Sequence, residues 1–556
     1  MSGNGVTPPA SSTLGQPVLA IDGSAADSPT VTAAASAQVD LDEQRPIGAC
    51  HPWRVAALFV VPYLILMLSW VLANPPGAAP DEPDHLVKAI GMATFDIGDE
   101  YAPVEPESGL LRQRNASISR VIPVPGNLSP GGFACMAFKS TMPAACQYGT
   151  TATSTAPVTW VDPLGSYPPF LYVPLGWVAS LAPTPTAAFL MVRVFCALLC
   201  SVLLLLGAAH LVRTLGSRAL LGGFVALTPM AVYSSSVVSA SGLEICAAFA
   251  TTCVVVVALR RPDTLRDSGT ALLLAGVGGT LILSRQLGVV TFGLLMLLLL
   301  IRLRPAFFWK LLLARKPGVL AAIGLLVACG AALAWWERNF DHPSMVGSPF
   351  NPSAVGAFAE QSYGLVRSGV GLFGWVDTPM PPWFTGLWVT LMLVLIGLAV
   401  LVSRLADRWT LLTWLALLCL VAFFTYATVF YPIGSHAQGR HLLAFFMLLP
   451  MLSGVIASER LDALDLDISR RLFSMVGVAV PALQFVALYL NSRRYAVGTK
   501  GPVWFLSDAQ WQPLLGWVPW LVFGLVGAML LGRCIHRLRG DEPVRSLGEE
   551  PAHVER

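Results

Sequence analysis

Five ionisable side chains follow the first strongly apolar stretch of the chain, within the short sequence PDEPDHLVK. They are Asp81, Glu82, Asp84, His85 and Lys88. Ionisable groups at or inside an apolar zone are costly to keep there, so they usually face a cavity or a substrate. Carboxyl groups beside a histidine and a lysine can supply an ionised general base together with neighbours that bind or tune it.

The same residues carry the pattern of a helix start. Pro83 suits the first turn of a helix, where its missing N–H would have no partner, and Asp81 can cap that helix. Helical spacing then places Asp81, His85 and Lys88 on one face. The alternative is a capped helix start that only faces solvent. The position of these residues directly after a membrane-length apolar run favours a functional role over that alternative.

A second polar group, SHAQGRH, lies between two later apolar runs. Arg440 and His441 stand at the start of the apolar stretch 442–455. An arginine beside the free backbone N–H groups of a helix start makes a good anion site, suited to a phosphate. The alternative is an arginine whose head group only reaches toward the membrane surface.

Isolated charges at the ends of other apolar runs fall on the same predicted side of the membrane. They are Arg193, Glu244, Arg285, Glu337 and Arg338. Each alone is typical of one half of a structural ion pair. Together they favour a polar cavity near one membrane face.

The segment GLFGWVDTPMPP combines glycine, tryptophan and proline around Asp377. Such a composition indicates a rigid surface loop. Trp375 could contact a sugar through its ring, with Asp377 beside it. A purely structural loop is the alternative.

Composition identifies the class of protein. Of 556 residues, 55% are hydrophobic and 12% charged, with a mean hydropathy of +0.66. Soluble globular proteins carry about 25% charged residues, so the chain is predicted to be an all-α, polytopic integral membrane protein embedded in a lipid bilayer. The net charge of +3 is too small to indicate a nucleic-acid partner.

Apolar runs of membrane length predict about twelve transmembrane helices within a membrane domain over residues 53–532. They lie near 53–73, 187–209, 219–238, 243–259, 270–284, 287–301, 317–336, 384–403, 409–430, 441–457, 472–490 and 514–532.

Arginine and lysine gather in alternate loops, which the positive-inside rule assigns to the cytoplasm together with both termini. The three long segments 74–185, 339–382 and 491–513 are then extracytoplasmic, and so is the predicted active site. Residues 1–52, rich in Ala, Ser, Thr and Pro, are expected to form a disordered cytoplasmic tail, and residues 533–556 a second cytoplasmic tail.

Two features of the first long loop stand out. The aromatic and proline-rich stretch 166–183 predicts an interfacial or re-entrant helix, although an ordinary transmembrane helix is the alternative. Cys135 and Cys146 lie close together in a segment predicted to face an oxidising exterior, where a disulfide is plausible and two free thiols are the alternative. No Cys/His spacing indicates a zinc site.

Several of these motifs resemble a known family. PDEPDH, YPPFLY, FGWVDTPMP and QGRH are similar to segments of the bacterial membrane family called domain of unknown function 2142. The acidic pair after the first span, the long first loop and some ten further spans resemble the GT-C superfamily of membrane glycosyltransferases more broadly. The resemblance extends over about residues 53–490.

The resemblance implies an activity and roles for particular residues. In GT-C enzymes an acidic residue of the first loop deprotonates the acceptor, which matches Asp81 with Glu82 as its partner. Basic residues hold the lipid phosphate, which matches Arg440 and then Arg285. Other substrate-binding candidates follow from the motifs: His85, Lys88, His441, Trp375 and Asp377.

The expected function is sugar transfer from a polyprenyl-phosphate-linked donor to a glycan or lipid acceptor of the cell envelope, at the inner (plasma) membrane. No DxD motif occurs in the extracytoplasmic loops, which favours metal independence, although a divalent cation stays an alternative. Two other functions stay open: a transporter or flippase of a lipid-linked sugar, and a non-catalytic partner in envelope assembly.

Overall fold

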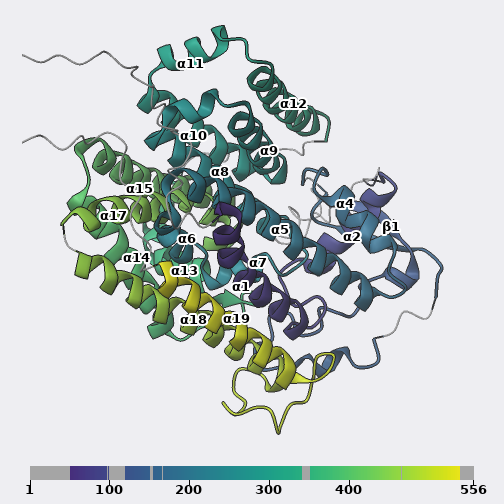
Figure 1. Cartoon of the computed structure of the whole chain (residues 1–556). Helices are drawn as coiled ribbons and strands as arrows, with labels where there is room; N and C mark the ends of the chain where they lie inside the picture. Colours follow the sequence, from purple (N-terminus) through teal and green to yellow (C-terminus); the bar gives the residue numbers. More distant parts are fainter. Residues whose placement is uncertain are drawn as a thin grey trace, which may run out of the picture. The chain divides into compact units, whose positions relative to one another are not determined.

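The computed structural model describes residues 51–96, 98, 119–150, 154–165, 167–340, 351–464 and 466–538. Residues 1–50 of the predicted tail 1–52 and residues 539–556 of the predicted tail 533–556 therefore lie outside the described residues. What is described is overwhelmingly helical, which confirms the predicted all-α, polytopic fold class (Figure 1).

Ten helical segments of the described chain are long and apolar enough to cross a membrane. They contain α1 (Pro52–Ala73), α5 (Pro185–Leu215), α8 (Ala240–Arg260), α10 (Gln286–Leu303), α12 (Pro317–Phe340), α14 (Pro382–Val402), α15 (Leu405–Thr425), α17 (Leu448–Leu464), α18 (Leu466–Val497) and α19 (Trp517–Leu538).

Two predicted spans take a different form. The first, 270–284, is the shorter helix α9 (Ser268–Ser284). For the second, 219–238, the prediction of a single helix is wrong, because α6 (Leu221–Ala226) ends before α7 (Pro229–Ser234) begins. Thr228 precedes a proline, which disfavours helical backbone, and its hydroxyl caps α7 by accepting a hydrogen bond from the Ala231 N–H at 3.1 Å. Both short helices are buried in protein.

Shorter elements lie between the long helices. Helix α4 (Tyr172–Ser180) has nine residues, too few to cross a bilayer, in the stretch predicted to be interfacial or re-entrant. It packs on α2 (Glu82–Ala93). The remaining α-helices are α11 (Pro305–Leu313), α13 (Ser353–Val370) and α16 (Leu443–Phe446).

Two small antiparallel strand pairs were not predicted from the sequence. Strands β1 (Arg120–Val124) and β2 (Val158–Asp162) pair antiparallel, with Arg120 opposite Asp162. Strands β3 (Leu372–Phe373) and β4 (Thr378–Pro379) form the second pair, a hairpin. In the first pair, β2 ends in a buried aspartate, Asp162, and this strand lies beside α2.

The core of the bundle lies around α8, because 94% of the 18-residue apolar stretch of this helix is buried in protein. Helix α8 packs against α5 and α9, and α1 packs against α5 and α19 (Figure 1). Small residues allow the close approach: a Cβ on Gly207 of α5 would lie 2.7 Å from the Ala250 Cα of α8.

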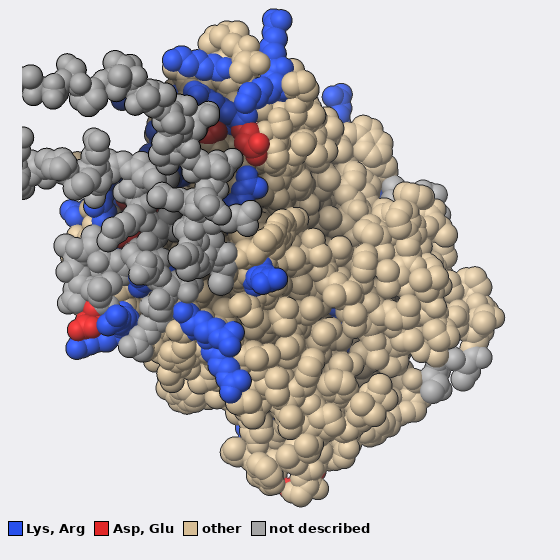
Figure 2. Space-filling view, in the orientation of Figure 1, with Lys and Arg blue, Asp and Glu red and all other residues tan. Residues whose placement is uncertain are grey.

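Ion pairs join the helix ends at which the basic loops lie. Asp407 accepts hydrogen bonds from Arg260 at 2.7 Å and from Arg302 at 3.0 Å, which ties α15 to α8 and α10. Basic side chains on the visible face lie over the upper and left parts of Figure 2, and few charges show on the rest of that face. This distribution agrees with the alternating loop charge of the sequence.

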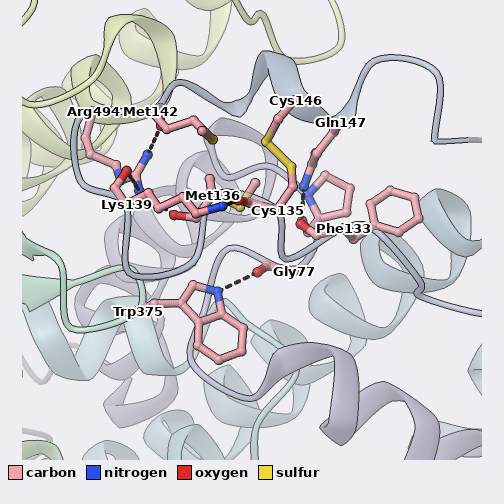
Figure 3. Close-up of a disulfide and its surroundings, with 11 residues drawn as sticks. Gly77, Phe133, Cys135, Met136, Lys139, Met142, Cys146, Gln147, Trp375 and Arg494 are labelled. Carbon is pink, nitrogen blue, oxygen red and sulfur yellow. Dashed lines mark hydrogen bonds between the residues drawn. A yellow bond between two sulfur atoms is a disulfide. The ribbon is translucent and has the colours of Figure 1, made fainter.

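Contacts over a long sequence distance fix the first loop at the other helix ends (Figure 3). Arg494 at the end of α18 donates hydrogen bonds to the carbonyl groups of Met142 at 2.6 Å, Met136 at 3.1 Å and Lys139 at 3.2 Å. The Cys135–Cys146 disulfide, one of the two alternatives for these thiols, is formed within the same segment.

Replacing Cys135 and Cys146 together by serine should lower the stability of the purified protein by about 3 kcal/mol, because the unfolded chain loses a cross-link. Thermal unfolding in detergent measures the loss. Cys419→Ser, at an exposed free cysteine, is the matched control. Equal melting of the double variant and the control would contradict the expectation.

Candidate functional site

An ion pair without solvent exposure anchors the PDEPDH segment. The Arg193 guanidinium of α5 donates two hydrogen bonds to the Glu82 carboxylate, at 2.7 and 2.6 Å, and both side chains are 0% exposed. Its other N–H groups donate to the carbonyl groups of Val71, Asn74 and Pro75 at the end of α1, at 2.8 to 3.2 Å. Every N–H of this guanidinium is therefore used.

The Glu82 carboxylate has a structural role in this arrangement. It accepts hydrogen bonds from the backbone N–H groups of Val238 at 2.9 Å and Ala79 at 3.3 Å, in addition to those from Arg193. These bonds join α1, α2, α5 and the segment before α8. A carboxylate with four donors and no exposure is suited to positioning, so we reassign Glu82 from catalytic partner to positioning residue.

Asp81 stands at the N-terminal boundary of α2 but does not cap it. Its backbone is left-handed, with φ of 57°, and its side chain makes no capping hydrogen bond. The predicted cap is therefore wrong. Non-glycine residues in this conformation are uncommon and are often found at functional sites, held there by surrounding contacts. Here the neighbouring Glu82 is held by the ion pair, and the Asp81 side chain is left half-buried.

Asp81 and Arg440 lie near enough for their charges to interact, although they are far apart in the sequence. Burial raises the pKa of the Asp81 carboxyl, and the positive charges of Arg440 and then Arg285 oppose that rise. No hydrogen bond or ion pair within the described ranges holds the Asp81 carboxylate. The structure thus places a half-buried acid within the electrostatic influence of two arginines.

Arg440 also lacks a hydrogen-bond or ion-pair partner among the described residues. It lies half-buried at the start of the apolar segment Gly439–Arg460, its Nε is buried without a hydrogen bond, and no described residue forms an ion pair with it. An arginine without a partner at such a place is costly unless an anion joins it. His441 follows, with its ring stacked on Phe430 at 6.0 Å between centroids.

Arg285 stands between α9 and α10 and is oriented by three groups. It donates to the hydroxyl groups of Ser241 and Tyr167, both at 2.9 Å, and lies 3.7 Å from a carboxylate oxygen of Glu244. Its guanidinium also lies over the Tyr167 ring, 5.0 Å from the centroid. Arg285 is therefore fixed in place, whereas Arg440 is not.

His85 is held as a neutral imidazole. Its Nδ1 lies 2.7 Å from the Tyr172 hydroxyl, and its ring stacks on that of Tyr172. Burial, with the charges of Arg285, Arg440 and Lys88, keeps the pKa of His85 well below its usual value. A neutral His85 can exchange hydrogen bonds with a substrate hydroxyl group without adding charge.

Lys88, Asp162 and Asp84 continue the line of charges along α2. Lys88 donates to the carbonyl groups of Leu164 at 2.8 Å and Gly165 at 3.1 Å, and burial lowers its pKa to about 8. Burial raises the pKa of Asp162 to about 6, against the opposing charge of Lys88. Burial and the Asp162 carboxyl raise the pKa of Asp84 to about 7, although the Trp160 N–H donates to it at 2.9 Å.

We call this set the polar cluster. It consists of Asp81, Asp84, His85, Lys88, Asp162, Tyr167, Tyr172, Arg285 and Arg440. No group of three His, Cys, Asp or Glu side chains in the described part of the chain has an arrangement that could hold a metal ion.

Trp375 and Asp377 are engaged elsewhere. The Trp375 N–H donates to the Gly77 carbonyl at 2.9 Å (Figure 3). Asp377 forms an ion pair with Arg494 at 2.8 Å. Both contacts fix the hairpin β3–β4 to its surroundings. They agree with the alternative that this loop is purely structural. Asp377 also lines a separate cavity of about 390 Å³, together with Phe138 and Arg493.

Three members of the polar cluster, Asp162, Tyr167 and Tyr172, had no role predicted from the sequence. Asp162 is the single acidic residue in TWVDPLG. Its position among apolar neighbours is the only sequence signal that could have identified it as a candidate. Tyr172 is one of several aromatic residues in the interfacial stretch, and nothing in the sequence pairs it with His85.

Glu82→Gln should destabilise the protein by about 3 kcal/mol or more, because Arg193 would keep its charge without a buried counterion. Thermal unfolding of the purified variant in detergent measures the change. Glu360→Gln is the matched control, since Glu360 is exposed on α13. A Glu82→Gln protein as stable as the control would contradict the anchoring role.

No curated protein matches the chain at a significant level. Residues 64–449 match the model of a family described as predicted membrane proteins, DUF2142. That match includes the PDEPDH segment, the interfacial stretch and QGRH, and thus every member of the polar cluster. The chain belongs to the DUF2142 family of membrane proteins.

Proposed function

We propose that this protein is a membrane glycosyltransferase of GT-C type. It transfers a sugar from a polyprenyl-phosphate-linked donor to a hydroxyl group of an envelope glycan or lipid, on the extracytoplasmic side of the inner membrane. One observation carries the proposal: Asp81 and Arg440, from distant parts of the chain, lie near enough for the Arg440 charge to act on the Asp81 carboxyl, and neither side chain has a hydrogen-bond or ion-pair partner among the described residues.

The two residues suit the two ends of the reaction. The acceptor hydroxyl gives its proton to the Asp81 carboxylate as its oxygen forms a bond to the anomeric carbon of the donor sugar. The bond between that carbon and the phosphate oxygen breaks, and the electron pair leaves with the polyprenyl phosphate. Arg440, and Arg285 beside it, stabilise the negative charge that develops on the leaving phosphate.

The remaining members of the polar cluster bind and orient. Neutral His85, held by Tyr172, offers a hydrogen bond to a sugar hydroxyl. Ser241, Tyr167 and Glu244 hold the Arg285 guanidinium before a donor arrives, so little reorganisation is needed at the moment of reaction. The carbonyl groups of Leu164 and Gly165 hold Lys88 beside Asp162.

Transport of a lipid-linked sugar is the second candidate. The break between α6 and α7 favours it, because transporters often bind substrates at discontinuous helices. Against it, the polar cluster lies at helix ends: Arg285 precedes α10 and Asp81 precedes α2. Formation of a new glycosidic bond by purified protein distinguishes transfer from transport.

Asp81→Asn should reduce sugar transfer at least a hundredfold with unchanged folding, because the amide cannot accept the acceptor's proton. Radiolabelled polyprenyl-phosphate sugars and a membrane acceptor fraction provide the assay. Asp508→Asn, at an exposed aspartate of the last long loop, is the matched control. Transfer by the Asp81→Asn protein at the control's rate would exclude Asp81 as the base.

Arg440→Gln should move the acidic limb of the pH profile of kcat/KM to higher pH. The Arg440 charge lowers the pKa of Asp81, so its removal lets that pKa rise, and the base stays protonated over a wider range. The same variant should raise KM for the lipid-phosphate donor about tenfold or more. Arg338→Gln is the control, and an acidic limb that stays in place would show that Arg440 does not act on the base.

A further inference from the structure

A cavity of about 230 Å³ lies at the helix ends opposite the polar cluster. Its walls come from the first turn of α1, the last turns of α5 and the first turn of α9. Three ionisable side chains line it: His210, Arg213 and Asp267. Nothing in the proposed sugar transfer uses these residues, so the cavity needs its own explanation.

His210 is buried in this cavity, and one of its ring nitrogens has no partner in the part of the chain that the structure describes. The residue is 9% exposed, and its Nε2 makes no hydrogen bond with the described residues. A buried ring nitrogen without a partner carries a desolvation cost that a bound ligand would offset. His210 thus indicates that the cavity takes a ligand with a polar group.

The two charges of the cavity have opposite signs and do not pair with each other. The Asp267 carboxylate accepts a hydrogen bond from the Thr270 N–H at 2.9 Å, and so caps α9. That hydrogen bond first, and the nearby Arg213 charge to a lesser degree, lower the pKa of Asp267. Arg213 is exposed, and no described residue forms an ion pair with it. The cavity therefore presents one cationic and one anionic side chain that lie near each other but form no ion pair.

The surroundings are those of a lipid headgroup site. Trp53, at the start of the first span, is 47% exposed beside the cavity, a position typical of tryptophan at a membrane surface. Leu206 and Leu273 supply apolar surface to the same cavity. Basic pockets between transmembrane helices are known sites for phospholipid headgroups.

We propose that this cavity binds the headgroup of a zwitterionic phospholipid with a primary ammonium group. The phosphate lies against Arg213 and the His210 ring, and the ammonium group lies against Asp267. The cap role of Asp267 gives a reason for the choice: the carboxylate occupies the amide groups of the α9 N-terminus, so a purely anionic headgroup would meet a negative charge there. The site is independent of the proposed sugar transfer.

Native mass spectrometry of the detergent-solubilised full chain tests the site. The protein is titrated in parallel with phosphatidylethanolamine, phosphatidylcholine and phosphatidylglycerol. Wild-type protein should bind phosphatidylethanolamine most tightly, because only that lipid combines the phosphate with an ammonium group that donates hydrogen bonds.

Charge variants assign the preference to this cavity. Asp267→Asn keeps the helix cap, since asparagine caps as well as aspartate. It should weaken phosphatidylethanolamine binding about fivefold and strengthen phosphatidylglycerol binding, whereas Arg213→Gln should weaken both about fivefold. The matched controls are Asp263→Asn and Arg261→Gln, at exposed residues near the same helix ends.

Three results would overturn the proposal: equal affinity of wild-type protein for the three lipids, Asp267→Asn binding like Asp263→Asn, or Arg213→Gln binding like Arg261→Gln. Thermal melting without added lipid shows that each variant is folded. A His210→Phe variant adds a further check, since it fills the cavity with an apolar ring and should weaken phosphatidylethanolamine binding whatever the state of the two charges.

Discussion

The ion pair between Arg193 and Glu82 is the constraint on which the site depends. One guanidinium, without solvent exposure, joins the end of α1 to the start of α2 from within α5, and the carboxylate it binds also receives the N–H of Val238 before α8. A buried pair of this kind adds little net stability compared with apolar packing, but breaking it is costly. Its effect is therefore on geometry: it determines where the chain turns before α2, and Asp81 lies at that turn.

The polar cluster is assembled from segments that no short stretch of sequence brings together. Asp81 comes from the turn before α2, Arg285 from the break between α9 and α10, and Arg440 from the start of a later apolar segment. Their states differ in a way that matches their proposed tasks. Arg285 is held by side chains around it, whereas Asp81 and Arg440 keep unused hydrogen-bonding capacity for a substrate.

Hydropathy and loop charge sufficed to predict the helical membrane fold, because a bilayer requires long apolar helices with internal hydrogen bonds. They failed at 219–238, where Thr228 and Pro229 end one helix and begin another inside a run that is apolar throughout. In the site, the ionisable residues were found by their cost in an apolar setting, but their partners were not. Glu82 and Arg193 meet only through tertiary packing, and Asp162 reaches α2 only because an unpredicted strand pair places it there.

The hydrogen bonds of Arg494 have a consequence for biosynthesis. The carbonyl groups of Met136, Lys139 and Met142 belong to the first long loop, and Asn74 at its beginning accepts a hydrogen bond from Asn491 at 2.7 Å. A ribosome delivers the loop long before it delivers α18. During that interval the first loop has been synthesised after α1, but Arg494, to which its carbonyl groups bind, has not. The loop that carries Asp81 is thus among the first parts to be made, and its final contacts are among the last to form.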